Sequence, residues 1–281
     1  MHIRAPFSGI SLLTVLVLAG CGTEPQADAS PTRADAAPAP AGHPATPPSE
    51  RNNMDNTPRN DAATATVPTP EKVLYQITDV EGKGALTYEI ANGSHIAWWT
   101  GLQFETSGKT YYTGFAWSTP NKYGAARASG AVDPAAKATL AHATYVQSAP
   151  GSDTPWTLVG SESWIGEFGQ AERGNAIDGS RTAVEWTAPS GKFVLAQPSL
   201  IAQGGQNTPA FEVLVFNPHE LQDSEERKWR HMGTLPGTTL QLVPDAGADM
   251  PRIQVNGAGT AGGDKPAEYR YDSANTTYRS I

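Results

Sequence analysis

The chain has little sulfur and a deficit of positive charge, and both shortages limit its function. Its 281 residues include one cysteine, Cys21, so neither an internal disulfide framework nor a thiol nucleophile in the rest of the chain is available. Lysine and arginine number 20 against 28 aspartates and glutamates. The first 70 residues hold four of the basic and six of the acidic residues, which leaves a net charge of −6 on the remainder. This balance argues against nucleic acid as a partner, because nucleic-acid binding needs a basic surface.

Sequence motifs of several enzyme classes are also missing. The chain has no Gly-x-Ser-x-Gly nucleophile elbow. His219-Glu220 begins like the zinc-protease motif His-Glu-x-x-His, but Asp223 stands where the second histidine is required. Residues 257–262 match the spacing of a dinucleotide-binding loop, yet Pro266 follows where that loop needs a helix. We therefore expect neither a metal nor a cofactor.

Aromatic residues are absent from residues 22–70, where ten prolines are interleaved with alanine, threonine and asparagine. Such a segment cannot bury enough apolar surface to offset an ordering entropy of about 1–2 kcal/mol per residue. We therefore predict a disordered linker over residues 21–70. A single globular domain is expected over residues 71–281.

The N-terminal segment carries a specific signal. Arg4 precedes an apolar stretch that starts near Phe7 and ends in Leu18-Ala19-Gly20-Cys21. The stretch is shorter than the ~20 apolar residues of a membrane-spanning helix, but it has the parts of a secretory signal peptide. It resembles the lipobox of bacterial lipoproteins. The resemblance implies that residues 1–20 are a signal peptide, that Cys21 is acylated after cleavage, and that the protein contacts the membrane through this lipid.

The residue after the cysteine bears on the membrane that holds the anchor. In bacterial lipoproteins an aspartate at this position often retains the protein at the inner membrane. Gly22 stands there in this chain. The resemblance therefore implies attachment to the outer membrane, with the globular domain facing the periplasm.

The pattern of residues 71–281 is typical of an all-β domain. Ala85–Ile90 alternates apolar and polar residues before Asn92-Gly93, a strong signal for a hairpin turn. Further strand-like runs are Val73–Thr78, His95–Phe104, Thr110–Trp117, Thr139–Gln147, Trp156–Val159, Thr182–Trp186, Phe193–Ala196, Phe211–Phe216, Trp229–Leu235, Thr239–Val243, Arg252–Val255 and Glu268–Tyr271. Many short antiparallel strands predict a sandwich or barrel, with a small β-propeller as the alternative.

Two segments compete with a purely β assignment. Asp133-Pro134 and Asn217-Pro218 both carry helix-start signals, so one or two short helices are expected. The second segment lies between Phe211–Phe216 and Trp229–Leu235, which we interpret as the two strands of one hairpin. A strand pair with such a long connection is also found in propeller blades, which is the basis of the alternative fold.

Tryptophans are the first candidates for a ligand-binding surface. Trp98 and Trp99 are adjacent, so on a strand they point to opposite faces and only one of them is expected in the core. With Trp117 and Trp164 they form a candidate set that would stack on a sugar or grip a protein partner. The alternative is that these rings stabilise the sheet across its strands.

Carboxylates are the candidates for chemistry. Glu162 and Glu167 flank Trp164, and glycosidases use two carboxylates about 5–10 Å apart beside an aromatic subsite. Asp178 and Glu185 are further candidates for such a pair. The alternative is that all four are solvated acids in loops.

Two function classes remain. The first is a lipid-anchored envelope protein whose domain binds an envelope protein or a glycan without catalysis. Its layout is similar to that of inhibitors and immunity proteins that neutralise wall-degrading toxins. The alternative is an envelope-anchored carbohydrate-active enzyme that uses a Glu/Asp pair. The missing catalytic motifs favour the first class.

Overall fold

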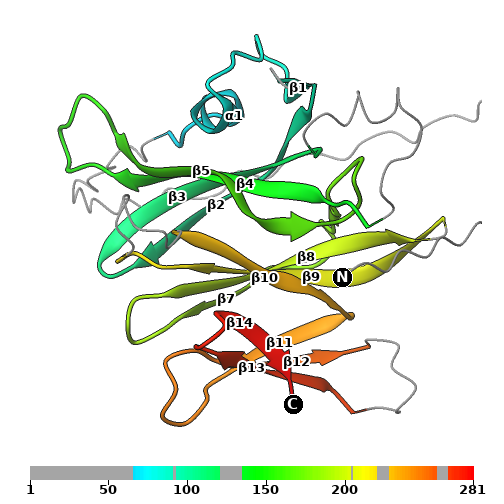
Figure 1. Cartoon of the computed structure of the whole chain (residues 1–281). Helices are drawn as coiled ribbons and strands as arrows, with labels where there is room; N and C mark the ends of the chain where they lie inside the picture. The colour runs from blue at the N-terminus through cyan, green and yellow to red at the C-terminus, as the bar shows by residue number, and fades with distance from the viewer. Residues whose placement is uncertain (1–65, 91–92, 121–134, 204, 220–227, 258–264) are drawn as a thin grey trace, which may run out of the picture. The chain divides into compact units, whose positions relative to one another are not determined.

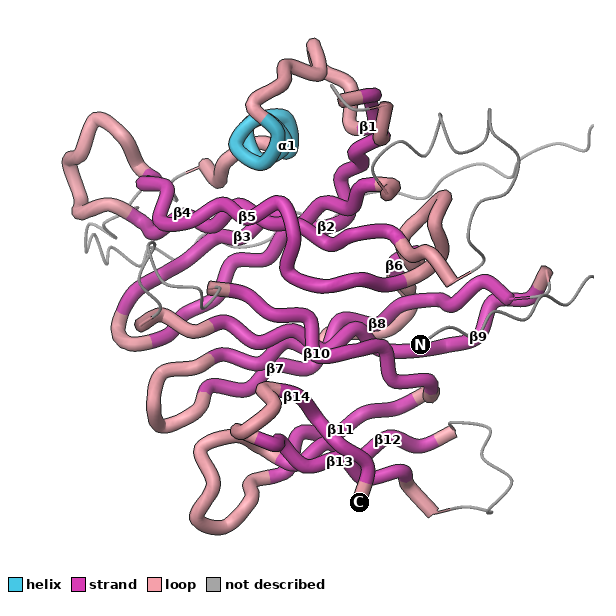
Figure 2. Tube along the Cα trace, viewed as in Figure 1, coloured by secondary structure: helices cyan, strands magenta, loops and turns pink. Residues whose placement is uncertain are grey.

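The computed structural model describes residues 66–90, 93–120, 135–203, 205–219, 228–257 and 265–281. Within these residues the chain forms one helix and fourteen strands, and the strands pair into three antiparallel sheets (Figure 1). Helix α1 and the three sheets are stacked in layers, as Figure 2 shows. The predicted all-β class is therefore confirmed. The sheets are open and stacked face to face, which is the sandwich arrangement rather than a closed barrel or a propeller.

The first layer is helix α1 (Pro70–Thr78), and here the prediction of a strand over Val73–Thr78 is wrong. Thr69 caps the helix by accepting a hydrogen bond from the Lys72 amide, and Pro70 occupies the first turn, where its missing N–H is not needed. Val73 and Leu74 are fully buried against the sheet below. Local capping and this apolar face outweigh the β-branched composition that favoured a strand.

The second layer, which we call the outer sheet, contains five strands in sequence order. They are β1 (Thr87–Glu89), β2 (His95–Thr106), β3 (Lys109–Ser118), β4 (Ala138–Gln147) and β5 (Trp156–Phe168). The antiparallel pairing of β1 with β2 confirms the hairpin predicted around Asn92-Gly93. Helix α1 covers one face of this sheet.

The third layer, the central sheet, is built on two long strands. Its members are β6 (Ala176–Ile177), β7 (Val184–Thr187), β8 (Phe193–Gln203), β9 (Gln206–Phe216) and β10 (Trp229–Pro236). Strands β9 and β10 pair antiparallel, which confirms the hairpin predicted for Phe211–Phe216 and Trp229–Leu235.

The fourth layer, the end sheet, is a meander of the last four strands. They are β11 (Thr239–Val243), β12 (Arg252–Asn256), β13 (Ala267–Asp272) and β14 (Thr277–Ser280). The apolar residues of these strands point toward the central sheet, and the charged residues alternate with them.

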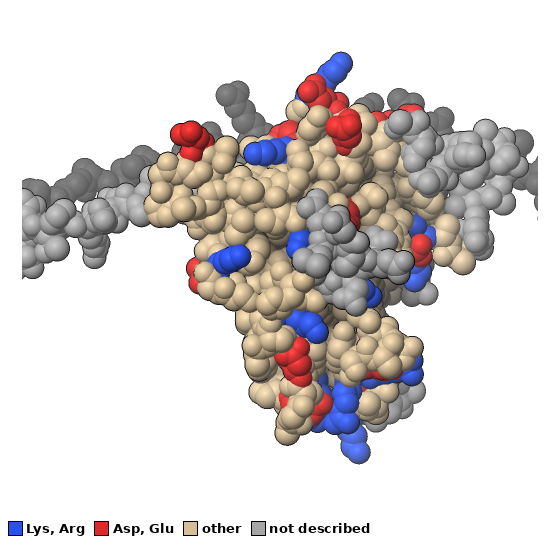
Figure 3. All heavy atoms as spheres, turned by 60° about the vertical axis from the view of Figure 1, so that its left-hand side comes forward, with Lys and Arg blue, Asp and Glu red and all other residues tan. Residues whose placement is uncertain are grey.

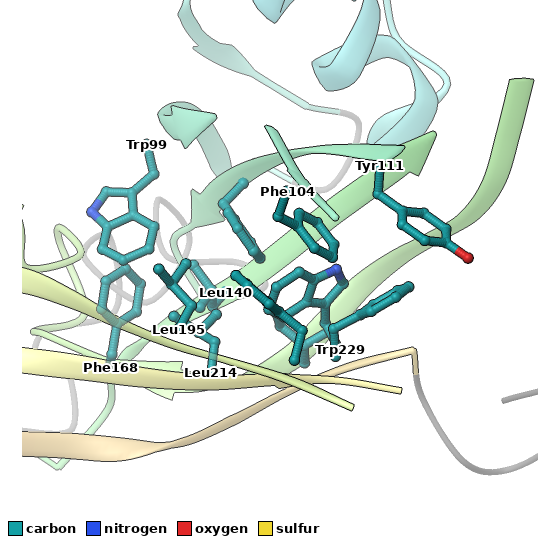
Figure 4. Packing of buried hydrophobic residues seen from close by; sticks show 12 residues of the cluster. Trp99, Phe104, Tyr111, Leu140, Phe168, Leu195, Leu214 and Trp229 are labelled. Atoms are coloured by element: carbon teal, nitrogen blue, oxygen red, sulfur yellow. The ribbon is translucent and has the colours of Figure 1, made fainter. Parts of the chain in front are cut away.

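The central sheet is buried on both faces, so its strands need apolar residues in succession rather than in alternation. Along β9, Leu214 and Phe216 face the outer sheet, while Val213 and Val215 face the end sheet. The first interface is rich in aromatic rings; Figure 4 shows Trp229 among Phe104, Tyr111 and other core residues. The second interface is mainly aliphatic. The strand Phe211–Phe216 is therefore the structural centre of the domain.

In the two segments where short helices were predicted, the described residues are not helical. In the first segment, residues 133–134 lie outside the described residues, and Ala138 already begins strand β4. In the second, residues 217–219 form a turn and residues 220–227 lie outside the described residues. Only α1 is helical among the described residues.

Candidate functional site

Strand β2 separates the two adjacent tryptophans. Trp99 lies in the core between the outer and central sheets, where its indole N–H donates to the carbonyl oxygen of Asn175 over 2.8 Å. Trp98 lies half-buried on the other face, packed beside α1. An irregularity in the β2–β3 register falls between Trp98 and Thr100. Both rings therefore contribute to packing on opposite faces of the outer sheet.

The other two candidate tryptophans differ in exposure. Trp117, on β3, is half-buried and packs against the core between the outer and central sheets. Trp164, on β5, has 43% of its surface exposed. The sequence could not rank the four rings, because strand alternation assigns faces but does not say which face another layer covers. In the fold, Trp164 is the candidate ring with a large solvent-exposed area.

The two candidate glutamates, both on β5, lie in different environments. Glu167 is exposed and pairs in register with Thr139. The carboxylate of Glu162 contacts the Nε2 atom of His142, whose side chain is fully buried, and accepts a hydrogen bond from the Lys228 amide over 3.1 Å. The β4–β5 register shifts between Glu162 and Glu167, on the stretch of β5 that faces Leu140 and His142. The structure thus ties Glu162 into the fold and leaves Glu167 in solvent.

Electrostatics favour an ionised Glu162. Burial of its carboxyl group opposes ionisation, but the hydrogen bond and charge of His142 and the amides of Lys228 and Trp229 outweigh it and hold its pKa below the usual value. A glycosidase acid needs a raised pKa so that it is protonated when it donates. Glu162 in this environment is an acceptor and an anchor for the strand that begins at Trp229.

A chain of hydrogen bonds continues from Glu162 into the core. His142 Nδ1 lies 2.9 Å from the Thr144 hydroxyl, and Thr144 lies 2.8 Å from the hydroxyl of Thr113. The indole N–H of Trp229 donates to both hydroxyls, over 3.1 and 3.2 Å. The outer and central sheets are therefore joined by polar contacts within an apolar core.

A second buried histidine–glutamate pair was missed by the sequence analysis. Glu212, on β9, is fully buried, and its Oε2 atom accepts hydrogen bonds from His231 (2.8 Å) and Thr234 (2.7 Å). Its Oε1 atom accepts from Asn175 (2.7 Å) and Ser199 (2.9 Å). The available signal was the single acid in the apolar run Phe211–Phe216, since a lone carboxylate inside a buried strand requires partners.

The strands around this pair approach closely. Gly166, on β5, has φ +153°, and a Cβ atom there would lie 2.6 Å from the Cβ of His231. Burial opposes ionisation of Glu212, but the hydrogen bond and charge of His231, with Asn175 and Thr234, outweigh it and hold the pKa of this carboxyl below its usual value. Each oxygen of the Glu212 carboxylate thus accepts two hydrogen bonds. The arrangement is that of a structural, fully hydrogen-bonded carboxylate.

The described residues also enclose clefts. One of about 720 Å³ lies where the β2–β3 turn and the β4–β5 connection meet, and it is lined by Gly108–Thr110, Val146–Ser152 and Pro155. Its lining contains one charged side chain, Lys109, and no aromatic ring. It therefore lacks the stacking surface that a sugar site uses.

The described part of the chain contains no group of three or more histidines, aspartates or glutamates arranged to hold a metal ion. None of the helical segments described there has the length and apolar character needed to cross a membrane. Cys21, the predicted lipidation site, and the predicted signal peptide lie outside the described residues.

Comparison of the chain with known protein families, with curated proteins and with solved structures gave no match.

Proposed function

We propose that this protein is a lipoprotein of the outer membrane, anchored through Cys21, whose β domain faces the periplasm and binds another envelope component without catalysing a reaction. One observation carries the proposal. On strand β5, the best candidate acid, Glu162, is bound to His142 and to main-chain amides, whereas Trp164, two residues further along the same strand, has 43% of its surface exposed. A large exposed tryptophan is a common anchor of binding interfaces.

The partner that this surface suits best is a protein. Leu158, six residues before Trp164 on the same strand, is also exposed, with 39% of its surface in solvent. Exposed apolar side chains on a rigid strand form a binding surface with little loss of conformational entropy. The predicted layout, a linker over residues 21–70 followed by the β domain, is also similar to that of inhibitors and immunity proteins. The alternative partner is a glycan, and the experiment must distinguish it from a protein.

The test is in-cell crosslinking of the full-length tagged chain, followed by identification of what remains attached. We expect an envelope protein to be recovered with the unchanged chain and to fall about tenfold or more with Trp164→Ala. The matched control is Leu86→Ala, because Leu86 is 42% exposed but lies before β1. Equal recovery with both variants would contradict a binding role for Trp164, and recovery of wall glycan alone would replace the protein partner.

Two further measurements test the anchor and the catalytic alternative. Cys21→Ser should move the protein from the membrane fraction to the soluble fraction; unchanged membrane attachment would contradict the lipid anchor. If the unchanged protein releases sugar fragments from cell wall, and both Glu162→Gln and Glu167→Gln abolish this activity, the carbohydrate-active enzyme would be favoured. Absence of any turnover by the unchanged protein would leave the binding role as the better explanation.

A further inference from the structure

A small pocket lies at the junction of the central and end sheets, and no strand of the outer sheet, which carries Trp164, contributes to its lining. Its volume is about 240 Å³. It is lined by the β7–β8 turn, the loop between β11 and β12 and the end of β13, which contribute Lys192, Asp245, Ala248, Asp249, Met250, Arg270, Tyr271 and Ser273. Side chains of both charge signs gather over this end of the molecule in Figure 3.

The charges in the lining cancel. Two cations, Lys192 and Arg270, face two carboxylates, Asp245 and Asp249. A simple anion would be attracted by one half of this lining and repelled by the other, and the same holds for a simple cation. A ligand that carries both a positive and a negative group matches both halves.

Each cation can leave its carboxylate without leaving that carboxylate unpaired. Lys192 Nζ lies 3.7 Å from Asp249 Oδ2, beyond normal hydrogen-bond length, and Asp249 also accepts from the amide (3.1 Å) and hydroxyl (2.7 Å) of Ser190. Arg270 Nε lies 2.9 Å from Asp245, which Arg252 also approaches at 3.5 Å. Asp249 is thus held by Ser190, and Asp245 stays within ion-pair distance of Arg252.

The cations themselves have room to move. The side chain of Lys192 is 30% exposed and that of Arg270 is 56% exposed. When they turn toward a ligand carboxylate, Asp245 and Asp249 remain in the lining as carboxylates that a ligand ammonium group can approach. The ion pairs within the pocket therefore exchange for equivalent pairs with the ligand, which limits the desolvation cost of binding.

The remaining lining limits the size and character of the ligand. Met250 is buried and Ala248 and Tyr271 add apolar surface. The pocket is smaller than the about 300–1,000 Å³ that is typical of drug-sized ligands. We infer that this pocket binds a small zwitterion of the α-amino-acid type, either a free amino acid or a dipeptide, with a short apolar side chain. This inference goes beyond the proposed function, because the pocket lies apart from Trp164 and needs no macromolecular partner.

The test is calorimetric titration of the full-length chain, kept in mild detergent, with L-alanine and with L-alanyl-L-alanine. At least one of them should bind, and the tighter of the two identifies the source of the zwitterion. N-acetyl-L-alanine, which lacks the ammonium group, and L-alaninamide, which lacks the carboxylate, should each bind about tenfold more weakly or worse. Equal binding of the blocked and unblocked compounds, or no binding of either zwitterion, would overturn the inference.

Substitutions then locate the site. Lys192→Gln and Arg270→Gln should each weaken binding of the zwitterion about tenfold. The matched control is Arg279→Gln: Arg279 is 59% exposed, pairs with Asp272 on the same sheet and lies outside the pocket, so affinity should stay within about twofold. An equal loss with Arg279→Gln would contradict the assigned pocket.

A charge-specific readout separates binding from a structural effect. Asp249→Asn keeps oxygen and nitrogen atoms beside Ser190 but removes the negative charge. It should abolish the preference for L-alanine over N-acetyl-L-alanine while leaving the thermal unfolding temperature close to that of the unchanged chain. A preserved preference would overturn the role of Asp249. Binding of an envelope protein at Trp164 is measured separately, by crosslinking, so either proposal can fail without the other.

Discussion

The interface between the outer and central sheets and the interface between the central and end sheets solve the same packing problem in different ways. The first contains eight buried aromatic rings, Trp99, Phe104, Tyr111, Phe115, Phe168, Phe193, Phe216 and Trp229. It also includes the half-buried Glu162–His142 pair and the buried Glu212–His231 pair. The second is filled mainly by aliphatic and methionine side chains, and the described members of its core carry no carboxylate or imidazole. Strand β9 supplies both interfaces from its two faces.

The difference indicates that the two interfaces have different requirements. Apolar area stabilises any close packing of two sheets at about 25 cal/mol per Å² and does not depend on one register. A buried carboxylate with four donors is satisfied in one arrangement only, and any shift leaves charged or polar groups unpaired. We therefore expect the first interface to be sensitive to polar substitutions and the second to be sensitive mainly to lost volume.

Glu212→Gln should have the largest effect on stability. The amide removes the charge and places an N–H group against the donors His231, Asn175, Ser199 or Thr234. We expect a loss of about 3–5 kcal/mol in the free energy of unfolding, measured by urea denaturation. Glu167→Gln, an exposed change on the neighbouring sheet, should stay within about 0.5 kcal/mol. Similar losses in the two variants would contradict the distinction between the interfaces.

The same carboxylate also determines how the stability of the folded chain should depend on pH. Because the pKa of Glu212 is lower in the folded chain than in the unfolded chain, its contribution is present above the unfolded value of about 4.3 and is lost as pH falls through the folded value. Denaturation curves between neutral pH and pH 3 should therefore show a smaller acid-induced loss of stability in Glu212→Gln than in the unchanged chain. A larger loss in the variant would contradict the sign.

Arg181→Ala tests polar contacts at the edge of the second interface, outside the apolar core that we expect to respond mainly to lost volume. The Arg181 guanidinium donates to the carbonyl oxygens of Ser199 (2.9 Å) and Ala210 (2.8 Å) in the central sheet and to Gly237 (3.1 Å), where the chain leaves for the end sheet. The central carbon of the Arg181 guanidinium, Cζ, also lies 4.6 Å from the ring centre of Phe211. We expect a loss of about 2–3 kcal/mol by urea denaturation. Arg279→Ala, an exposed ion-pair variant, should lose at most about 1 kcal/mol; an equal loss would show that the Arg181 contacts contribute little.

Trp229→Phe should give the next largest effect. The change removes the indole N–H that donates to Thr113 and Thr144 and leaves a small cavity among the aromatic rings. We expect a loss of about 1–3 kcal/mol in the free energy of unfolding, from the same denaturation measurement.

Trp186→Phe is the matched variant in the second interface and should have the smallest effect. The buried indole nitrogen of Trp186 has no hydrogen-bond partner, so its removal relieves a desolvation cost that offsets the lost ring area. We expect the stability to stay within about 1 kcal/mol of the unchanged chain. A loss as large as that of Trp229→Phe would contradict the view that polar contacts distinguish the two interfaces.

Much of the fold was predictable, because it depends on short-range signals. Alternation and turn residues located Thr239–Val243 without error and most other strands to within a few residues. The strand predicted over Val73–Thr78 failed because β-branched composition was weighed above the Thr69-Pro70 helix start. Strand β14 was missed because Thr277–Ser280 is short and largely polar.

The candidate site was less predictable. The sequence identified Trp98, Trp99, Trp117 and Trp164 by type, but their exposure depends on which faces α1 and the central sheet cover. Likewise, nothing near Glu162 in the sequence indicates His142 or the Lys228 amide as its partners. These contacts form between strands that lie far apart along the chain, so local sequence patterns do not indicate them.

By itself the sequence determined the apolar stretch before Cys21, the proline-rich composition of residues 22–70 and most strands and hairpins of the β domain, because each depends on the chemistry of neighbouring residues. Only the tertiary structure decided that the sheets stack in three layers, that Glu212 meets His231 inside the first interface, and that Lys192 and Arg270 share a pocket. The physical reason is that stacking joins faces of different sheets, and the partners on those faces are set by the global arrangement of the layers rather than by any local run of residues.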